Sequence, residues 1–308
     1  MFRKILVATE LAGQCDAPIL TAVQIAKECN SKLYILHVLE SRTSKDRRFV
    51  KHFKTGEDIF CSDEYVQTVG KEIQKCCAGI MDSNIHYEIK VLPGFPFEEI
   101  LKWARKESTD LVLMGAHTER AKDLDVIRVK GTVGSTVQGV VTHERCPVMI
   151  INRAAAEDKL KFKRIMVGID FSESCKNALL FAVKLAQKCE SKLFIFHMAP
   201  ASAYPPGIQT DFRGIANIMQ QRYDKLFEMI PKEISYGYDV WEGTQPHVEI
   251  LKYADKNQVD IIVLGSHTGD ESERWYVGSA VEEVSSKADC PVIVLTDPDA
   301  LARMDNFL

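Results

Sequence analysis

The chain has 308 residues, of which 46% are hydrophobic and 27% are charged, and its formal net charge at pH 7 is −4. This length suits two domains of ordinary size, and the acidic balance argues against a broad surface for nucleic acid or for an anionic membrane. The nine cysteines are scattered without a C-x-x-C pair, which indicates neither a disulfide framework nor a zinc site. With no apolar run near the roughly 20 residues of a membrane helix, we expect a cytoplasmic protein without a signal peptide.

The sequence repeats itself once along the chain. Residues 22–33 match residues 182–193 at an offset of 160, and residues 146–150 match residues 290–294 at an offset of 144. The falling offset means that the first copy is ten residues longer between its second strand and third helix, and six residues longer before its last helix. A period near 150 residues indicates a duplicated domain rather than a solenoid.

Two domains are therefore predicted, over residues 1–152 and 162–297. The junction, residues 152–161, is charged and contains three alanines. Ten extended residues span about 33 Å, so the junction is long enough to connect the end of one sheet to the start of another.

The second copy shows the predicted elements most clearly. Short apolar runs alternate with amphipathic stretches, which indicates successive β-α-β units. The predicted strands cover residues 164–169, 193–198, 235–240, 261–264 and 292–295. The predicted helices cover residues 178–189, 216–229, 247–256 and 279–287. Because the first copy repeats this order, the sequence predicts an α/β fold with two doubly wound, five-stranded parallel sheets of Rossmann-like type, each with strand order 3-2-1-4-5.

The closing strands, 148–151 and 292–295, are short and apolar. In this strand order each lies at a sheet edge, and an open apolar edge promotes aggregation. We predict that the two strands pair antiparallel about a pseudo-two-fold axis, which makes the chain an internal pseudo-dimer. A homodimer of whole chains would need another surface.

Small and polar residues follow the predicted strands of the second copy. Asp170 ends the first strand, Gly265 ends the fourth, and Gly278-Ser279 opens the last helix. The carboxyl ends of such strands form the ligand edge of the sheet. A glycine there allows close approach of a phosphate, and a helix N-terminus offers N–H groups and a positive dipole. The plainer interpretations are a strand-to-loop turn at Gly265 and helix capping by Gly278-Ser279 and by Asp170.

These motifs together resemble the ATP-binding branch of the universal stress protein family. The resemblance is carried by the pattern G-x2-G-x9-G-[ST], an aspartate ending the first strand, the segment IMVGIDFS at residues 165–172 and the closing C-P-V strand. It covers nearly the whole chain twice, which implies a tandem two-domain member. It implies ATP with Mg²⁺ as the ligand. The site that it implies in the second copy has Ile169, Asp170 and Met198 near adenine and ribose, and Gly265, His267, Gly278 and Ser279 on the phosphates. Leu264, Thr268 and Ala280 complete the predicted site.

Both copies depart from the family pattern. Thr268 stands where the family has glycine. If that position requires a positive φ, the cost is about 1–2 kcal/mol, or about tenfold in affinity, although Gly269 next to it can take up the turn. In the first copy Glu10 replaces the aspartate. Fifteen residues, instead of nine in the second copy, separate Thr118 from Gly134-Ser135. We expect the first-copy site to be altered, covered by the loop at 119–131, or inactive. Its residues would be Thr9, Glu10, Val38, Gly115, His117, Gly134 and Ser135.

The sequence contains none of the common enzymatic signatures: no G-x4-G-K-[ST], G-x-G-x-x-G, G-x-S-x-G or H-E-x-x-H. His37 and His197 lie within apolar strands and are predicted to be core side chains. The favoured prediction is a stress-response regulatory protein that binds an adenine nucleotide mainly in its second copy, hydrolyses it very slowly or not at all, and has an unidentified protein partner. The alternative is a structural or interaction protein of the stress response that binds no nucleotide.

Overall fold

The structure is a computed structural model. It describes residues 2–10, 17–41, 47–81, 84–116, 133–152, 162–200, 212–266, 278–297 and 300. No helix within these ranges is both long and apolar enough to cross a membrane.

The first repeat contains seven strands and four helices in its described residues. In chain order they are β1 (Lys4–Ala8), α1 (Ala17–Cys29), β2 (Lys32–Glu40), β3 (Phe49–Lys51), β4 (Asp58–Phe60), α2 (Asp63–Cys77), β5 (Tyr87–Gly94), α3 (Pro96–Glu107), β6 (Leu111–Gly115), α4 (Ser135–His143) and β7 (Val148–Ile151).

The second repeat contains five strands and four helices in its described residues. They are β8 (Arg164–Ile169), α5 (Glu173–Cys189), β9 (Lys192–Pro200), α6 (Phe212–Phe227), β10 (Tyr236–Gly243), α7 (Pro246–Lys256), β11 (Ile261–Gly265), α8 (Ser279–Lys287) and β12 (Val292–Leu295).

The main strands of both repeats form one sheet of ten strands, in the order β10-β9-β8-β11-β12-β7-β6-β1-β2-β5. Within each repeat the neighbouring strands are parallel. Counted within a repeat, this is the order 3-2-1-4-5, so the predicted doubly wound α/β fold is confirmed.

The repeats join through their closing strands, as predicted. β7 and β12 pair antiparallel, with Val148 opposite Val294, Met149 opposite Ile293 and Ile150 opposite Val292. All eight residues of the two strands are buried. The apolar edge that each repeat would otherwise expose is therefore covered by the other repeat.

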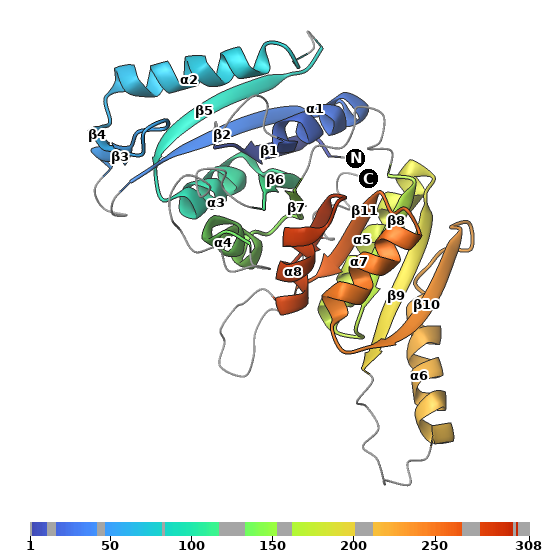
Figure 1. Cartoon of the computed structure of the whole chain (residues 1–308). Coiled ribbons are helices and arrows are strands. Elements are labelled where there is room, and N and C mark those ends of the chain that lie inside the picture. The colour runs from blue at the N-terminus through green and yellow to red at the C-terminus, as the bar shows by residue number, and fades with distance from the viewer. Residues whose placement is uncertain are drawn as a thin grey trace.

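Helices cover both faces of the sheet and give three layers (Figure 1). One apolar core lies between the sheet and α1, α2, α5 and α6, and a second core lies between the opposite face and α3, α4, α7 and α8. Each core contains residues of both repeats. Burial on both faces explains why the central strands are continuous apolar runs instead of alternating patterns.

Polar anchors repeat in the two halves. Asp110 Oδ2 accepts hydrogen bonds from the backbone N–H groups of Arg3 (2.7 Å) and Lys4 (2.8 Å). In the second half Asp260 Oδ2 does the same for residues 163 and 164, at 2.8 and 2.9 Å. Each carboxylate fixes the start of one strand beside its neighbour, β1 beside β6 in the first half and β8 beside β11 in the second. The carboxyl ends of the paired strands therefore lie at a common level.

The largest difference between the repeats is a hairpin in the first half that the sequence did not predict. β3 and β4 pair antiparallel in the stretch where the first copy is ten residues longer. The rings of Phe49 and Phe60 meet edge to face with centroids 6.0 Å apart, and both side chains are exposed. Strands of three residues give too short a pattern for alternation to reveal them.

Candidate functional site

The carboxyl ends of the central strands of the second half form a rim, below which apolar side chains are buried in the two cores on either face of the sheet. Ile169, at the end of β8, pairs with His197 of β9. Val167 pairs with Val263, so Gly265 at the end of β11 reaches the same level as Ile169. The side chains of Ile169 and Leu264 are each 5% exposed, and Met198 is half-buried.

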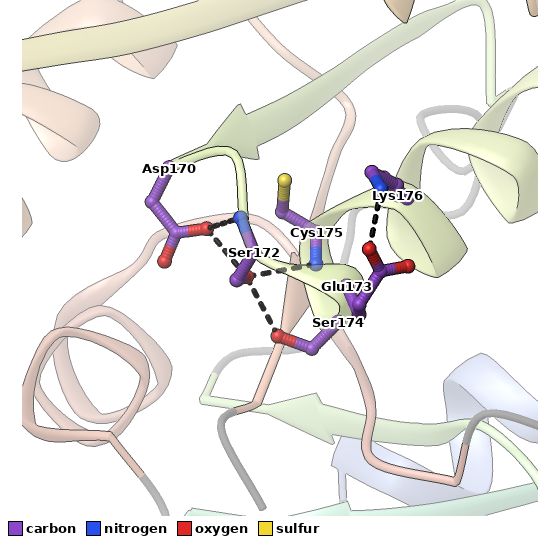
Figure 2. A network of polar contacts seen from close by, with 6 residues as sticks. All are labelled: Asp170, Ser172, Glu173, Ser174, Cys175 and Lys176. Carbon is purple, nitrogen blue, oxygen red and sulfur yellow. Dashed lines mark hydrogen bonds and ion pairs between the residues drawn. The ribbon is translucent and has the colours of Figure 1, made fainter.

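Asp170 lies exposed on this rim, directly after β8. Its Oδ1 accepts hydrogen bonds from the backbone N–H (2.9 Å) and the hydroxyl (2.5 Å) of Ser172, as Figure 2 shows. Ser172 is the N-cap of α5, since its hydroxyl oxygen accepts the Cys175 N–H at 3.2 Å. The interpretation of Asp170 as the N-cap is therefore wrong. Asp170 instead holds the capping residue Ser172 in place. Serine is a preferred N-cap residue, so Ser172 itself indicated the helix start in the sequence.

Between Asp170 and Ser172, Phe171 has a left-handed backbone with φ 65°. Its ring packs against the rings of His197 and Tyr223, with centroids 4.9 and 5.1 Å away. His197 is buried and its Nδ1–H donates to the Ile169 carbonyl at 2.8 Å, which confirms it as a core histidine. Burial raises the pKa of the Tyr223 phenol to about 12. This aromatic support beneath the rim was missed, because Tyr223 comes from a distant helix.

Gly265 touches the start of α5. A Cβ at this position would lie 2.3 Å from the Ser174 carbonyl oxygen and 2.8 Å from the Cys175 nitrogen. Only glycine permits this approach, since a backbone neighbour cannot move aside as a side chain can. The packing of α5 against β11 is therefore sufficient to explain Gly265. The same packing buries Cys175, and this burial raises the pKa of its thiol to about 11.

The predicted helix at residues 279–287 is α8. Its N-cap, Gly278, has extended backbone (φ −60°, ψ 140°) and supplies no side-chain hydrogen bond to the first turn. Ser279 is exposed and Ala280 is half-buried. The first N–H groups of a helix have no partner within the helix, so this end of α8 presents donors and the positive end of its dipole.

The first half has the same framework. The Thr9 carbonyl at the end of β1 accepts the Nδ1–H of His37 at 2.8 Å, and His37 is buried as predicted. Glu10 and Val38 are half-buried. The N–H of Gly134, the N-cap of α4, donates to the carbonyl of Ala116 at 3.0 Å.

That last bond joins the helix start to the end of β6. It brings Gly115, Gly134 and the exposed Ser135 close to the carboxyl ends of the strands. The remaining predicted site residues, His117, His267 and Thr268, lie outside the described residues, as do Thr118, Gly269 and the loop at 119–131.

The structure thus consists of two doubly wound α/β units, each with helix N-termini and strand ends at a common rim. The family model of the universal stress protein family matches residues 1–152 and 161–296. The chain belongs to this family.

Individual relatives and solved structures are similar to the chain over different shares of its length. A universal stress protein of Methanocaldococcus jannaschii is 23% identical over 156 residues, covering 48% of the chain and 91% of the relative. The crystal structure of a universal stress protein from Archaeoglobus fulgidus covers 96% of each chain, with 22% identity and a TM-score of 0.60. A structure of a universal stress protein from Archaeoglobus fulgidus in complex with dAMP covers 44% of the chain and 98% of its own, with 23% identity and a TM-score of 0.32.

Proposed function

We propose that the chain is a stress-response regulatory protein that binds an adenine nucleotide, ATP with Mg²⁺, at the rim of its second half. The observation that carries the proposal is the combination found at this rim. Ile169 and Leu264 lie buried at the carboxyl ends of adjacent strands, one in each of the two cores, and the exposed carboxylate of Asp170 directly follows Ile169. A helix without a side-chain cap begins at Gly278 on the chain segment that follows β11. This is the edge where doubly wound sheets bind nucleotides.

Each proposed role follows from side-chain chemistry. Ile169, Leu264 and Met198 offer apolar and backbone contacts to adenine, and Asp170 can accept a hydrogen bond from a ribose hydroxyl. The N–H groups of Ser279 and Ala280 and the Ser279 hydroxyl suit phosphate oxygens. His267 and Thr268 belong to the proposed site by resemblance. Among the described residues no three acidic, histidine or cysteine side chains are grouped to hold a metal ion, so the proposed Mg²⁺ would enter with the phosphates.

We propose different duties for the two domains, residues 1–152 and 162–297. In the first, Glu10 has a longer side chain than Asp170 and the segment before Gly134 is six residues longer. Glu10 follows β1 at the rim, and the longer segment connects the end of β6 to the start of α4, so the first domain would bind nucleotide weakly or not at all. The eight cysteines in the described part of the chain form no disulfide with one another, which is compatible with the proposed reducing cytoplasm. A regulatory rather than enzymatic output is proposed, with at most very slow ATP hydrolysis.

The test is calorimetric titration of the full chain with MgATP, together with a matched pair of variants. We expect about one site per chain. Ser279→Asp places a carboxylate against the phosphates, while an acid in the first helical turn favours the helix itself. This variant should lose at least tenfold in affinity without loss of stability. Ser135→Asp, the same change at the equivalent exposed position of α4, should leave the affinity unchanged. Two equivalent sites, no binding at micromolar protein, or an unaffected Ser279→Asp variant would refute the proposal.

The alternative, an interaction protein without nucleotide, is favoured by one observation. Gly265, which the family pattern assigns to the phosphates, has a sufficient structural reason in the backbone of α5. Absence of MgATP binding by the wild-type chain, with Ser279→Asp and wild type equally stable, would support this alternative.

A further inference from the structure

The centre of the ten-stranded sheet lies on a pseudo-two-fold axis. Met149 of β7 stands opposite Ile293 of β12, and these residues are equivalent in the two repeats, 144 positions apart. The axis therefore passes between them. In a symmetric pair made of two second halves, Ile293 would stand opposite its own copy, and the same holds for every residue on the axis.

A second pair of equivalent residues meets on this axis. Gln138 of α4 and Glu282 of α8 are also 144 positions apart, and Gln138 Nε2 donates a hydrogen bond to Glu282 Oε1 at 2.8 Å. Both side chains are half-buried. Partial burial raises the pKa of the Glu282 carboxyl, whereas the hydrogen bond from Gln138 acts in the opposite direction. The amide thus supplies a donor to a carboxylate that is partly removed from water.

A third contact across the interface is made by the first half without a matching contact from the described residues of the second half. Asn152, which follows β7, donates through Nδ2 to the carbonyls of Ser285 (2.8 Å) and Ala288 (3.0 Å) at the end of α8. These bonds satisfy backbone acceptors that a helix end leaves without partners. The equivalent residue of the second half is Thr296. Its buried hydroxyl makes no hydrogen bond with any residue that the structure describes.

We propose that the α8–β12 face of the second half is a docking surface selective for a first half and disfavours a second copy of itself. In a pair of two second halves, two Glu282 carboxylates would meet on the axis without a donor between them, and like charges in a partly buried site repel. Each α8 would also face Thr296 instead of Asn152. A first half brings an amide to both positions. The surface therefore selects the repeat joined to it in the same chain over other second halves in solution.

A double-mutant cycle in the full chain tests the role of the axis pair. Gln138→Glu reproduces the meeting of two glutamates, and we expect about a tenfold or larger fall in the equilibrium constant for folding, measured by urea denaturation. Glu282→Gln leaves two amides that can bond to each other and should change this constant by less than about threefold. The exchange Gln138→Glu with Glu282→Gln restores one donor and one acceptor and should recover the wild-type value to within the same factor. Additive effects of the two substitutions would overturn the proposal.

Selectivity itself can be measured on nicked protein in which both halves are retained. A protease site is placed within residues 153–161, and labelled and unlabelled nicked chains are mixed and analysed by native mass spectrometry. In wild type we expect pairs of a first with a second half to predominate. Pairs of two second halves should be several-fold more abundant in Glu282→Gln than in wild type. Equal abundance of such pairs in the two proteins, including none in either, would overturn the role given to Glu282.

Discussion

The two halves have the same strand order, but different side chains pack between the helix and the strand at their outer edges. In the second half, the Phe227 ring of α6 packs against Tyr238 and Tyr236 of β10, with centroids 4.8 and 5.6 Å away. In the first half the corresponding helix α2 ends at Cys77, as α6 ends at Phe227, and an open groove runs between α2 and β5. The groove is lined by Val66, Gln67, Gly70, Lys71, Gln74, Tyr87, Ile89, Lys90 and Val91.

The fold therefore depends on the central strands, where the halves agree, and tolerates change at the edges. Edge strands lack one neighbour, so their side chains can vary without disturbing a second strand. Substitutions near the centre should therefore cost more than substitutions at the outer edges, and the glycines of the two halves allow this to be tested with matched changes.

The largest effect is expected for Gly265→Ala. The added methyl group would meet the backbone of Ser174 and Cys175 at 2.3–2.8 Å, and α5 would have to move away from β11. We expect a loss of about 3 kcal/mol or more in the free energy of unfolding, measured by urea denaturation. The control is Gly237→Ala on the edge strand β10, where a Cβ has no neighbour within 4 Å. Equal losses in the two variants would contradict the close approach of α5.

Two glycines inside helices of the first half should respond with opposite signs. At Gly139 of α4 a Cβ would lie 2.8 Å from the Phe97 ring, whereas at Gly70 of α2 the nearest atom is 3.9 Å away. Alanine is favoured over glycine in a helix by about 1 kcal/mol. Gly70→Ala should therefore stabilise by about this amount. Gly139→Ala should destabilise by about 1–2 kcal/mol, because overpacking exceeds the gain in helix propensity. Thermal unfolding monitored by circular dichroism distinguishes the two, and a shift of the same sign in both variants would contradict the different spacings around Gly70 and Gly139.

A smaller effect is expected for Tyr253→Phe in α7. The Tyr253 hydroxyl donates to Asp239 Oδ2 at 2.7 Å, and burial together with this bond raises the pKa of the phenol. A hydrogen bond to a carboxylate contributes about 1–2 kcal/mol, which the variant should lose in urea denaturation. Its equivalent in the first half, Trp103, has a buried indole N–H without a partner among the described residues. Tyr236→Phe, at a tyrosine 41% exposed on the edge strand, serves as the control; a comparable loss there would show that the Asp239 bond is not the cause.

The smallest effect concerns pH. Glu144 is 5% exposed, and burial raises the pKa of its carboxyl above the ordinary value. Its equivalent in the second half is Ala288. The folded state therefore holds this proton more tightly than the unfolded state, so stability falls as pH rises from the ordinary glutamate pKa through the raised one.

Glu144→Gln should remove that decline while the side-chain oxygen still accepts from the N–H groups of Arg145 and Cys146. Urea denaturation at pH 4 and pH 7 measures the change, with the exposed Glu228→Gln as control. An identical pH dependence in wild type and Glu144→Gln would show that Glu144 has the same pKa in both states.

The fold was predictable because the repeat supplies each element twice. The runs that form β8 and β12 and the helix α8 have the predicted limits, and the pairing of β7 with β12 followed from their apolar character and edge position. The hairpin β3–β4 was not predictable from its two three-residue strands. It lies in an insertion, so the second copy offers no counterpart for comparison.

The candidate site was predictable only in part. The positions of Asp170, Gly265 and Gly278 follow from strand ends and helix starts. Their contacts do not. The reason for Gly265 lies in the backbone of a helix about ninety residues earlier in the chain, and the meeting of Gln138 with Glu282 depends on the register of two strands, which no local pattern reveals.

The antiparallel junction of β7 and β12 also fixes the direction in which each half faces. In the ten-stranded sheet the strands of one half run parallel to each other, and the two halves run in opposite directions. The carboxyl rim of the first half therefore lies at one end of the strands and that of the second half at the other. Molecules bound at the two rims would not touch, and neither rim lends residues to the other. A chain built in this way can change or lose one site without altering the other, while the shared centre keeps both halves in place.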